Sequence, residues 1–448
     1  MTSWLLERME GWRAEPALVW GDTRCTYGEL LDAVATWRVE LERHGLGQGS
    51  VVAIEGTFSP KACALLLALL ERRAIAVPIT PGSHVHRSDY ETISEAEATF
   101  SFDPSDVVTV TRHARTPSHA LTKKLQARGH AGLVIFSSGS SGVPRAVLHD
   151  FEALLEKFRT PRHRKTVLTF LLFDHIGGID TLMNTLASGG LVVTTPSHAP
   201  EAVCALIERH KVHTLPTSPT FLNLLLVSEV WQQHDLSSLQ TIAYGTEPMP
   251  AATLARLAAV FPETKLVQTY GMSELGVLRS RSKPDGSLWI SFTNDGFETQ
   301  VRDGVLWVRT PTAMLGYLNA PDLFDADGWL NTQDAVEVDG PWLRVLGRQS
   351  DLINVGGEKV YPAEVEAVVL RLSNVADVAV YGEKSPLTGQ FVAARVNLVE
   401  PEPFDVFKRR LRAHCREHLE AFKVPVRIEL TDEKQFSARF KKVRRPGS

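Results

Sequence analysis

Short strand-like segments alternate with helical segments along the first third of the chain. Residues 51–54 are predicted as a strand, residues 62–70 as a buried helix and residues 74–79 as the next strand. Ahead of them, Thr26 and Glu29 form a capping-box pattern that begins an amphipathic helix. Alternation of this kind favours parallel strands joined by crossover helices. We therefore predict an α/β fold with mostly parallel sheets and flanking helices.

The pattern changes after the strand-like run 342–346. Two further strand-like runs, 375–381 and 392–399, flank a turn, and a charged amphipathic helix follows from about 404 to 419. A chain of 448 residues also exceeds the size that one hydrophobic core usually supports. We predict a large N-terminal domain over residues 1–349 and a small α+β C-terminal domain over residues 350–448.

Composition narrows the functional classes. The net charge of −4 argues against a general nucleic-acid-binding protein. The four cysteines lie far apart and form no CxxC or Cys/His pattern, which is typical of reduced thiols in the cytoplasm. An apolar run at 61–79 is interrupted by Glu71, Arg72 and Arg73 before it could span a bilayer. We expect a cytoplasmic protein with no membrane segment and no nucleic-acid partner.

A loop rich in hydroxyls and glycines follows the strand-like residues 132–136, and it ends in Pro144 and Arg145. Glycines let backbone N–H groups approach a phosphate, hydroxyls add donors and the cation offsets charge. The spacing of a Walker A loop is absent, and a Ser/Gly surface linker is the alternative. The predicted phosphate-binding residues are Ser137, Ser138, Gly139, Ser140, Ser141, Gly142 and Arg145.

The segment 136–145 resembles the phosphate loop of the adenylate-forming superfamily, which includes acyl-CoA synthetases, adenylation domains of peptide synthetases and luciferases. It departs from the family pattern at Arg145, where lysine is usual. Four more segments resemble family motifs in the family's order: 245–248, 269–274, 332–334 and 347–364. The last is similar to the hinge segment of acyl-CoA synthetases, and the resemblance covers essentially the whole chain.

The resemblance implies a nucleotide site in the N-terminal domain. Thr269 would contact the α-phosphate, and Glu274 would hold Mg²⁺, a cation that prefers carboxylate and phosphate oxygens. Asp334 would bind the ribose hydroxyls, with Gln333 beside it in place of the family's glycine. The other residues implied at the nucleotide are Gly245, Thr246, Glu247, Pro248, Tyr270, Gly271 and Arg348.

The family also carries a lysine near the C-terminus that reaches the carboxylate and phosphate oxygens during adenylation. In the register we prefer, this residue is Lys442, and Lys441 takes the place of the glycine that precedes it. A shift by one residue would assign the role to Lys441. Most other basic residues of 434–445 are expected to lie on a solvated face.

The resemblance further implies that the small domain is mobile and swings about Ser350. The swing would withdraw the lysine and bring Gly356 and Gly357 against the site. Paired glycines leave room for a thin ligand such as a pantetheine arm. An ordinary tight turn is the alternative for the two glycines.

The candidate wall of the acid pocket is the segment 173–180, which resembles the histidine–glycine segment of acyl- and aryl-CoA ligases. Asp174 has two interpretations: it could bind a substrate ammonium, as in amino-acid-activating relatives, or cap the helix that follows, which we favour. The predicted substrate and thiol residues are Asp174, His175, Gly178, Ser218, Tyr244, Met272, Gly356 and Gly357. The sequence does not identify the acid.

The function that follows is ATP-dependent activation of a small carboxylic acid as an acyl-adenylate, with release of pyrophosphate. The acyl group would then pass to a pantetheine thiol, with coenzyme A preferred. Loading of a carrier protein's phosphopantetheine is one alternative, and a nucleotide-binding relative without turnover is another. The expected cofactors are ATP, Mg²⁺ and coenzyme A or carrier phosphopantetheine, and a homodimer is left open.

Overall fold

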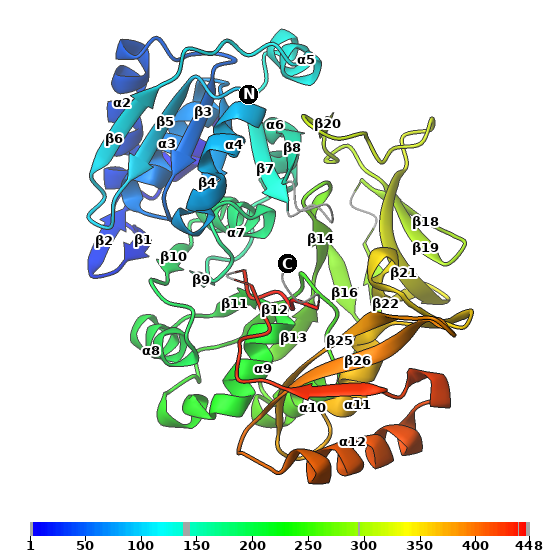
Figure 1. Ribbon diagram of the computed structural model, residues 1–448. Coiled ribbons are helices and arrows are strands. Elements are labelled where there is room, and N and C mark those ends of the chain that lie inside the picture. Colours follow the sequence, from blue (N-terminus) through cyan, green and yellow to red (C-terminus); the bar gives the residue numbers. More distant parts are fainter. Residues whose placement is uncertain (1–2, 138–143, 294–295, 438, 445–448) are drawn as a thin grey trace.

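Two seven-stranded sheets form most of the N-terminal region of the chain, with order β20-β8-β7-β4-β3-β5-β6 in one and β13-β12-β11-β9-β10-β1-β2 in the other. The computed structural model, shown in Figure 1, describes residues 3–137, 144–293, 296–437 and 439–444. The central strands of both sheets pair parallel, and β2, β6, β8 and β20 add antiparallel pairs toward the edges. The predicted α/β fold with mostly parallel sheets is confirmed.

The strands of the first sheet are β3 (Val51–Glu55), β4 (Ile75–Ile79), β5 (Ala98–Phe102), β6 (Val108–Arg112), β7 (Gly132–Ser137), β8 (Arg145–Asp150) and β20 (Gly316–Tyr317). Those of the second are β1 (Pro16–Trp20), β2 (Thr23–Thr26), β9 (Thr166–Thr169), β10 (Leu191–Thr194), β11 (Thr214–Thr217), β12 (Thr241–Tyr244) and β13 (Lys265–Gln268). The α-helices around them are α1 (Ser3–Glu10), α2 (Tyr27–Arg43), α3 (Pro60–Glu71), α4 (Arg87–Ile93), α5 (Ala120–Arg128), α6 (Phe151–Leu155), α7 (Ile176–Ala187), α8 (Pro200–His210), α9 (Pro219–Ser228) and α10 (Ala251–Val260).

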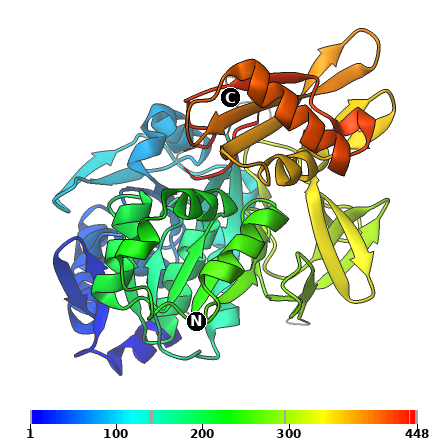
Figure 2. The same cartoon turned by 90° about the horizontal axis from the view of Figure 1, so that it is seen from below.

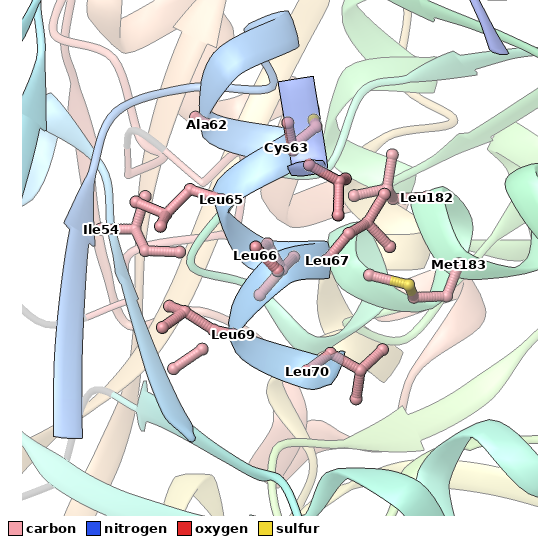
Figure 3. Close-up of a cluster of buried hydrophobic side chains, with 14 of the residues drawn as sticks. Ile54, Ala62, Cys63, Leu65, Leu66, Leu67, Leu69, Leu70, Leu182 and Met183 are labelled. Atoms are coloured by element: carbon pink, nitrogen blue, oxygen red, sulfur yellow. The ribbon is translucent and has the colours of Figure 1, made fainter. Parts of the chain in front are cut away.

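The two sheets are joined through helices that are buried between them. Every residue of α3 from Ala62 to Leu70 is buried, and Figure 3 shows Leu65 directed at Ile54 of β3 while Leu67 lies near Leu182 of α7. Apolar side chains of both sheets belong to the same cluster. Because burial of apolar surface is the main stabilising contribution, this shared core unites the two sheets in a single body that can hold residues of both in fixed positions.

A third sheet, with six strands that all pair antiparallel, follows in the sequence. Its strands are β16 (Ser280–Ser282), β17 (Ile290–Phe292), β18 (Glu298–Arg302), β19 (Val305–Arg309), β21 (Leu330–Asp339) and β22 (Trp342–Arg348), and the hairpin of β14 (Tyr270–Met272) and β15 (Gly276–Leu278) precedes it. In this region the sequence predicted only the strand at β22.

The C-terminal region has its own hydrophobic core. Its sheet contains β23 (Ile353–Val355), β24 (Glu358–Val360), β25 (Val375–Ser385), β26 (Gly389–Leu398) and β27 (Arg427–Leu430), covered by α11 (Pro362–Val369) and α12 (Phe404–His418). The smaller C-terminal domain is thus confirmed, whereas its boundary at 349/350 stays a prediction. Figure 2 shows this domain packed beside the N-terminal region, and the Asn223 side chain of α9 donates a 2.8 Å hydrogen bond to the Ala376 carbonyl.

The four cysteines are buried and carry free thiols. No α-helix among the described residues combines the length and apolar character that a membrane span requires.

Candidate active site

The two strands that flank the predicted phosphate loop pair with each other. Ser137 ends β7 and lies opposite Arg145, which begins β8. The loop therefore joins two antiparallel strands, whereas a Walker A loop leads into a helix. Ser138, Gly139, Ser140, Ser141 and Gly142 lie outside the described residues.

A tyrosine links the loop cation to the predicted metal ligand. The guanidinium of Arg145 lies 5.7 Å from the ring centroid of Tyr317, and the Tyr317 hydroxyl donates a 2.6 Å hydrogen bond to Oε1 of Glu274. Glu274 is buried, and burial together with the Glu274 charge raises the pKa of Tyr317, so the phenol stays a donor. One carboxylate oxygen of Glu274 is thus held by Tyr317.

Residues 245–248 and 269–274 lie side by side, because the strands that precede them, β12 and β13, pair in parallel. A Cβ at Gly245 would lie 2.6 Å from Oγ1 of Thr269, so only glycine fits this approach. Thr246 follows with φ +75°, and its hydroxyl is buried without a partner among the described residues.

The ribose-type aspartate is buried and contacts two polar side chains. Oδ2 of Asp334 accepts a 2.7 Å hydrogen bond from Tyr270, and Nε of Arg348 lies 3.3 Å from Oδ1. Burial raises the pKa of Asp334, whereas the Arg348 charge favours the carboxylate. The structure therefore brings together three residues that the resemblance placed at the nucleotide.

Glu247 uses its carboxylate to join segments of the protein. One oxygen accepts the backbone N–H of Thr220 at 2.8 Å, and the other accepts the backbone N–H of Lys442 at 2.9 Å. This predicted nucleotide residue therefore contacts the C-terminal segment in the structure.

The two candidate lysines differ in their electrostatic surroundings. The ammonium of Lys442 pairs with Asp377 of the small domain. Burial, with the charges of Arg439 and Arg348, lowers the pKa of Lys441 to about 8, and the charges of Glu247 and Glu274 oppose this shift. The ammonium of Lys442 is engaged by Asp377 within the small domain, which supports the alternative register, with Lys441. The assignment of the adenylation lysine stays a prediction.

The predicted pocket residues occupy helix starts and buried walls. Nδ1 of His175 accepts the backbone N–H of Gly177 at 3.0 Å and caps α7, so the expectation that Asp174 caps this helix is wrong. Burial, with the charges of Lys441 and Arg439, lowers the pKa of His175 well below its ordinary value. Ser218 caps α9, a Cβ at Gly178 would clash with the Leu172 carbonyl, and Tyr244 and Met272 are buried.

The hinge and thiol residues lie in the small domain and the turn before it. Ser350 belongs to the short 3₁₀ helix Gln349–Asp351. Gly356 and Gly357 have φ of +62° and +98° in the turn between β23 and β24. The Gly357 N–H donates to Oδ1 of Asn354 at 2.9 Å, so the turn is held by contacts of its own domain.

Sequence reasoning missed Tyr317 and Arg439. Oδ2 of Asp174, a buried carboxylate, accepts hydrogen bonds from Thr80, Ser83 and Arg439. The basic character of 434–445 was noted, but nothing in the sequence marks Arg439 within that run or joins it to a carboxylate 265 positions away. A lone tyrosine likewise gives no signal.

Solved structures of adenylate-forming enzymes share this fold. An anthranilate CoA ligase in complex with anthranoyl-AMP superposes with a TM-score of 0.83 at 20% identity, covering 98% of this chain and 95% of that one. An o-succinylbenzoate CoA synthetase from Bacillus subtilis, in complex with its acyl-adenylate intermediate, gives 0.79 at 24% identity over 98% and 96%.

Curated relatives are CoA ligases. A feruloyl-CoA synthase of an Amycolatopsis species is 28% identical over 96% of this chain and 94% of its own length. A 2-succinylbenzoate–CoA ligase of Bacillus licheniformis is 28% identical over 96% of both chains. A long-chain-fatty-acid–CoA ligase of Salmonella typhimurium is 30% identical over 66% of this chain and 58% of its own length.

Two family models match the sequence. The AMP-binding enzyme model matches residues 5–318, and the model of the AMP-binding enzyme C-terminal domain matches residues 364–441. These ranges span most of the described nucleotide-type residues and the segment that carries Lys441. The chain therefore belongs to the family of AMP-binding enzymes.

Proposed function

We propose that this chain joins a small carboxylic acid to the thiol of coenzyme A through an acyl-adenylate. The observation that carries the proposal is that the backbone N–H of Lys442, next to Lys441 in the small domain, donates a 2.9 Å hydrogen bond to Glu247 of the large domain. A cation delivered by a separate domain suits a reaction in which two anions must first meet. The CoA-ligase names of the full-length relatives support coenzyme A as the acceptor.

In the first step a carboxylate oxygen attacks the α-phosphorus of ATP, and the bond to pyrophosphate breaks. Lys441 offsets the charge that builds up between the two anions and orients them. Arg145 and the N–H groups of its loop would hold the leaving phosphates, and the Glu274 carboxylate, fixed at Oε1 by Tyr317, suits Mg²⁺. Bound there, the metal would neutralise phosphate charge.

In the second step the thiol attacks the acyl carbonyl and AMP leaves with the electron pair, while the thiol proton passes to solvent. We propose that Lys441 has to withdraw first, by rotation of the small domain about Ser350. The Gly356–Gly357 turn would then face the site. A cytoplasmic location and a homodimer stay predictions.

Acid-dependent exchange of labelled pyrophosphate into ATP tests the first step. A panel should contain aliphatic, aromatic and hydroxycinnamic acids together with amino acids. Exchange with at least one acid is expected, and its absence with every acid, in a protein that still binds ATP, would favour a nucleotide-binding relative without turnover. Free CoA compared with a phosphopantetheine carrier protein then identifies the acceptor.

Replacing Arg145 with alanine should raise the KM for ATP by about tenfold, the effect of losing one charged hydrogen bond of about 1.5 kcal/mol. Arg145→Lys should restore much of the loss, because lysine keeps the charge. Arg112→Ala, which removes an exposed arginine of β6, is the matched control. Normal ATP kinetics in Arg145→Ala would show that the loop does not hold phosphate.

Gly356→Leu should block the second step and spare the first, so that acyl-adenylate accumulates. The side chain would fill the space proposed for the pantetheine arm, but a φ of +62° also strains any residue other than glycine. Gly340→Leu separates the two effects, because Gly340 has φ +56° and open space around its Cβ. Quenched-flow measurement of both steps decides: equal slowing in the two variants would leave strain as the whole effect.

A further inference from the structure

An ion pair joins the C-terminal segment to the wall of the predicted acid pocket. Nη2 of Arg439, in the C-terminal segment, lies 2.9 Å from Oδ2 of Asp174, just before α7. Nη1 of the same arginine donates to the Phe136 carbonyl at 3.3 Å, on the strand that leads into the phosphate loop. Arg439 thus joins the small domain to the acid-pocket wall and to the strand that precedes the phosphate loop.

Asp174 is a buried carboxylate that needs a cationic partner. Its side chain is 1% exposed, and the partners of Oδ2 besides Arg439 are the hydroxyls of Thr80 and Ser83, at 3.0 and 3.1 Å. Oδ1 has no hydrogen-bond partner among the described residues. A buried carboxylate is stable only when it is paired, and removal of its partner is strongly unfavourable. The pair therefore favours whichever domain orientation brings Arg439 to Asp174.

The turn that carries Arg439 is held on a second side by an aromatic residue. Phe440 has φ +51°, a conformation for which glycine is usual, and its ring lies 5.3 Å from Phe170 and 6.1 Å from Phe221. The turn is closed by the hydrogen bond from the Ser437 N–H to the Lys441 carbonyl, 2.9 Å long. Arg439 and Phe440 anchor the turn, and Lys441 is the next residue along.

We propose that Arg439 is a positioning residue that docks the C-terminal turn on Asp174, so that Lys441 is delivered to the site in the adenylating orientation only. The pair has to separate before the second step, which makes it a latch between the two half-reactions. This inference rests on the proposed function, because it assigns the latch to the first of the two proposed steps. Asp174 then serves the protein's own arginine and not a substrate ammonium.

Arg439→Ala should slow acyl-adenylate formation by about tenfold or more, the effect of losing one charged hydrogen bond. Transfer from a supplied acyl-adenylate to the thiol should be unchanged or faster, because the small domain is released. Arg439→Lys should partly recover the first step. Adding Asp174→Asn to Arg439→Ala should restore thermal stability, since the double variant leaves no unpaired carboxylate.

Domain position can be measured without turnover. The native cysteines are buried, so spin labels on Val107→Cys and Leu387→Cys, which are 57% and 95% exposed in the two domains, would report one interdomain distance. With ATP, Arg439→Ala should shift this distance distribution away from that of the parent protein. Arg427→Ala, an arginine of the small domain in exposed ion pairs, should not.

An unchanged distance distribution, or equal slowing of both steps by Arg439→Ala, would overturn the latch. Failure of the proposed function looks different: the parent protein would exchange no pyrophosphate with any acid. The distance measurement would still report whether Arg439 docks the domain.

Discussion

Replacing Lys441 with alanine is expected to reduce acyl-adenylate formation by about a hundredfold or more, the scale seen when one donor to a developing charge is lost. Lys441 closes the docked turn, and the backbone N–H of the next residue, Lys442, contacts Glu247 across the domain boundary. Conversion of a supplied acyl-adenylate to thioester should survive, because the lysine has to leave before that step. Single-turnover assays of each half-reaction measure the two effects separately.

Lys442→Ala is the matched neighbour, and it should behave differently. Its ammonium pairs with Asp377, and both side chains are largely buried, with exposures of 11% and 9%. The variant should therefore lower the melting temperature of the small domain clearly. At a temperature where the protein is folded, it should reduce adenylation only weakly. Asp377→Asn added to Lys442→Ala should recover stability. If Lys442→Ala abolishes adenylation while Lys441→Ala does not, the register preferred from the sequence is right and the arrangement described here does not represent the reacting state.

The two registers show where local sequence signals end. The family pattern places glycine before the lysine, and no glycine occurs near the C-terminal lysines until Gly447. In the structure Phe440 takes the positive φ that glycine would supply, and aromatic packing against Phe170 and Phe221 accompanies it. The missing glycine therefore misled the choice of register, although the backbone keeps the conformation that glycine would supply. Tertiary contacts can hold a non-glycine residue at a positive φ.

Elements with strong local signals were predicted well. The capping box at Thr26 is present, with both reciprocal hydrogen bonds, and the amphipathic pattern from 404 becomes the helix Phe404–His418. The six-stranded antiparallel sheet was largely missed. Strand β18, for example, reads Glu-Thr-Gln-Val-Arg and is mostly exposed or half-exposed, so it shows no apolar alternation, and its pairing with β19 defines it. Such strands follow from tertiary pairing more than from intrinsic preference.

The site divides in the same way. The family motifs at 269–274 and 332–334 placed Thr269, Glu274 and Asp334 in one region. The structure brings Tyr270, Asp334 and Arg348 into contact there. The side chains that contact Glu274 and Asp174 come from distant parts of the sequence. Tyr317 lies 43 positions from Glu274, and Arg439 lies 265 positions from Asp174. A single sequence carries no record of such distant contacts. The catalytic roles themselves stay predictions until the variants are measured.

Glu274→Gln is the second change with a large expected effect: it should reduce adenylation by about a hundredfold or more while the protein still folds. The amide keeps the shape of the side chain and can still accept the 2.6 Å hydrogen bond from Tyr317 through its oxygen. It loses the negative charge that Mg²⁺ requires, and its NH₂ group would face the position of the cation. Pyrophosphate release with saturating ATP and acid is the measurement, with the melting temperature as the check on folding.

The Tyr317→Phe variant tests whether Glu274 is a metal ligand or only a buried carboxylate. Without the hydroxyl, Glu274 keeps its charge but loses the donor that fixes Oε1, so the concentration of Mg²⁺ needed for half-maximal ATP binding should rise several-fold, consistent with one hydrogen bond of about 1 kcal/mol. Titration calorimetry with a non-hydrolysable ATP analogue gives this value without turnover. High Mg²⁺ should restore binding in Tyr317→Phe but not in Glu274→Gln, because only the first variant retains the ligand. Unchanged Mg²⁺ dependence in both variants, with pyrophosphate release intact, would place the metal on other residues.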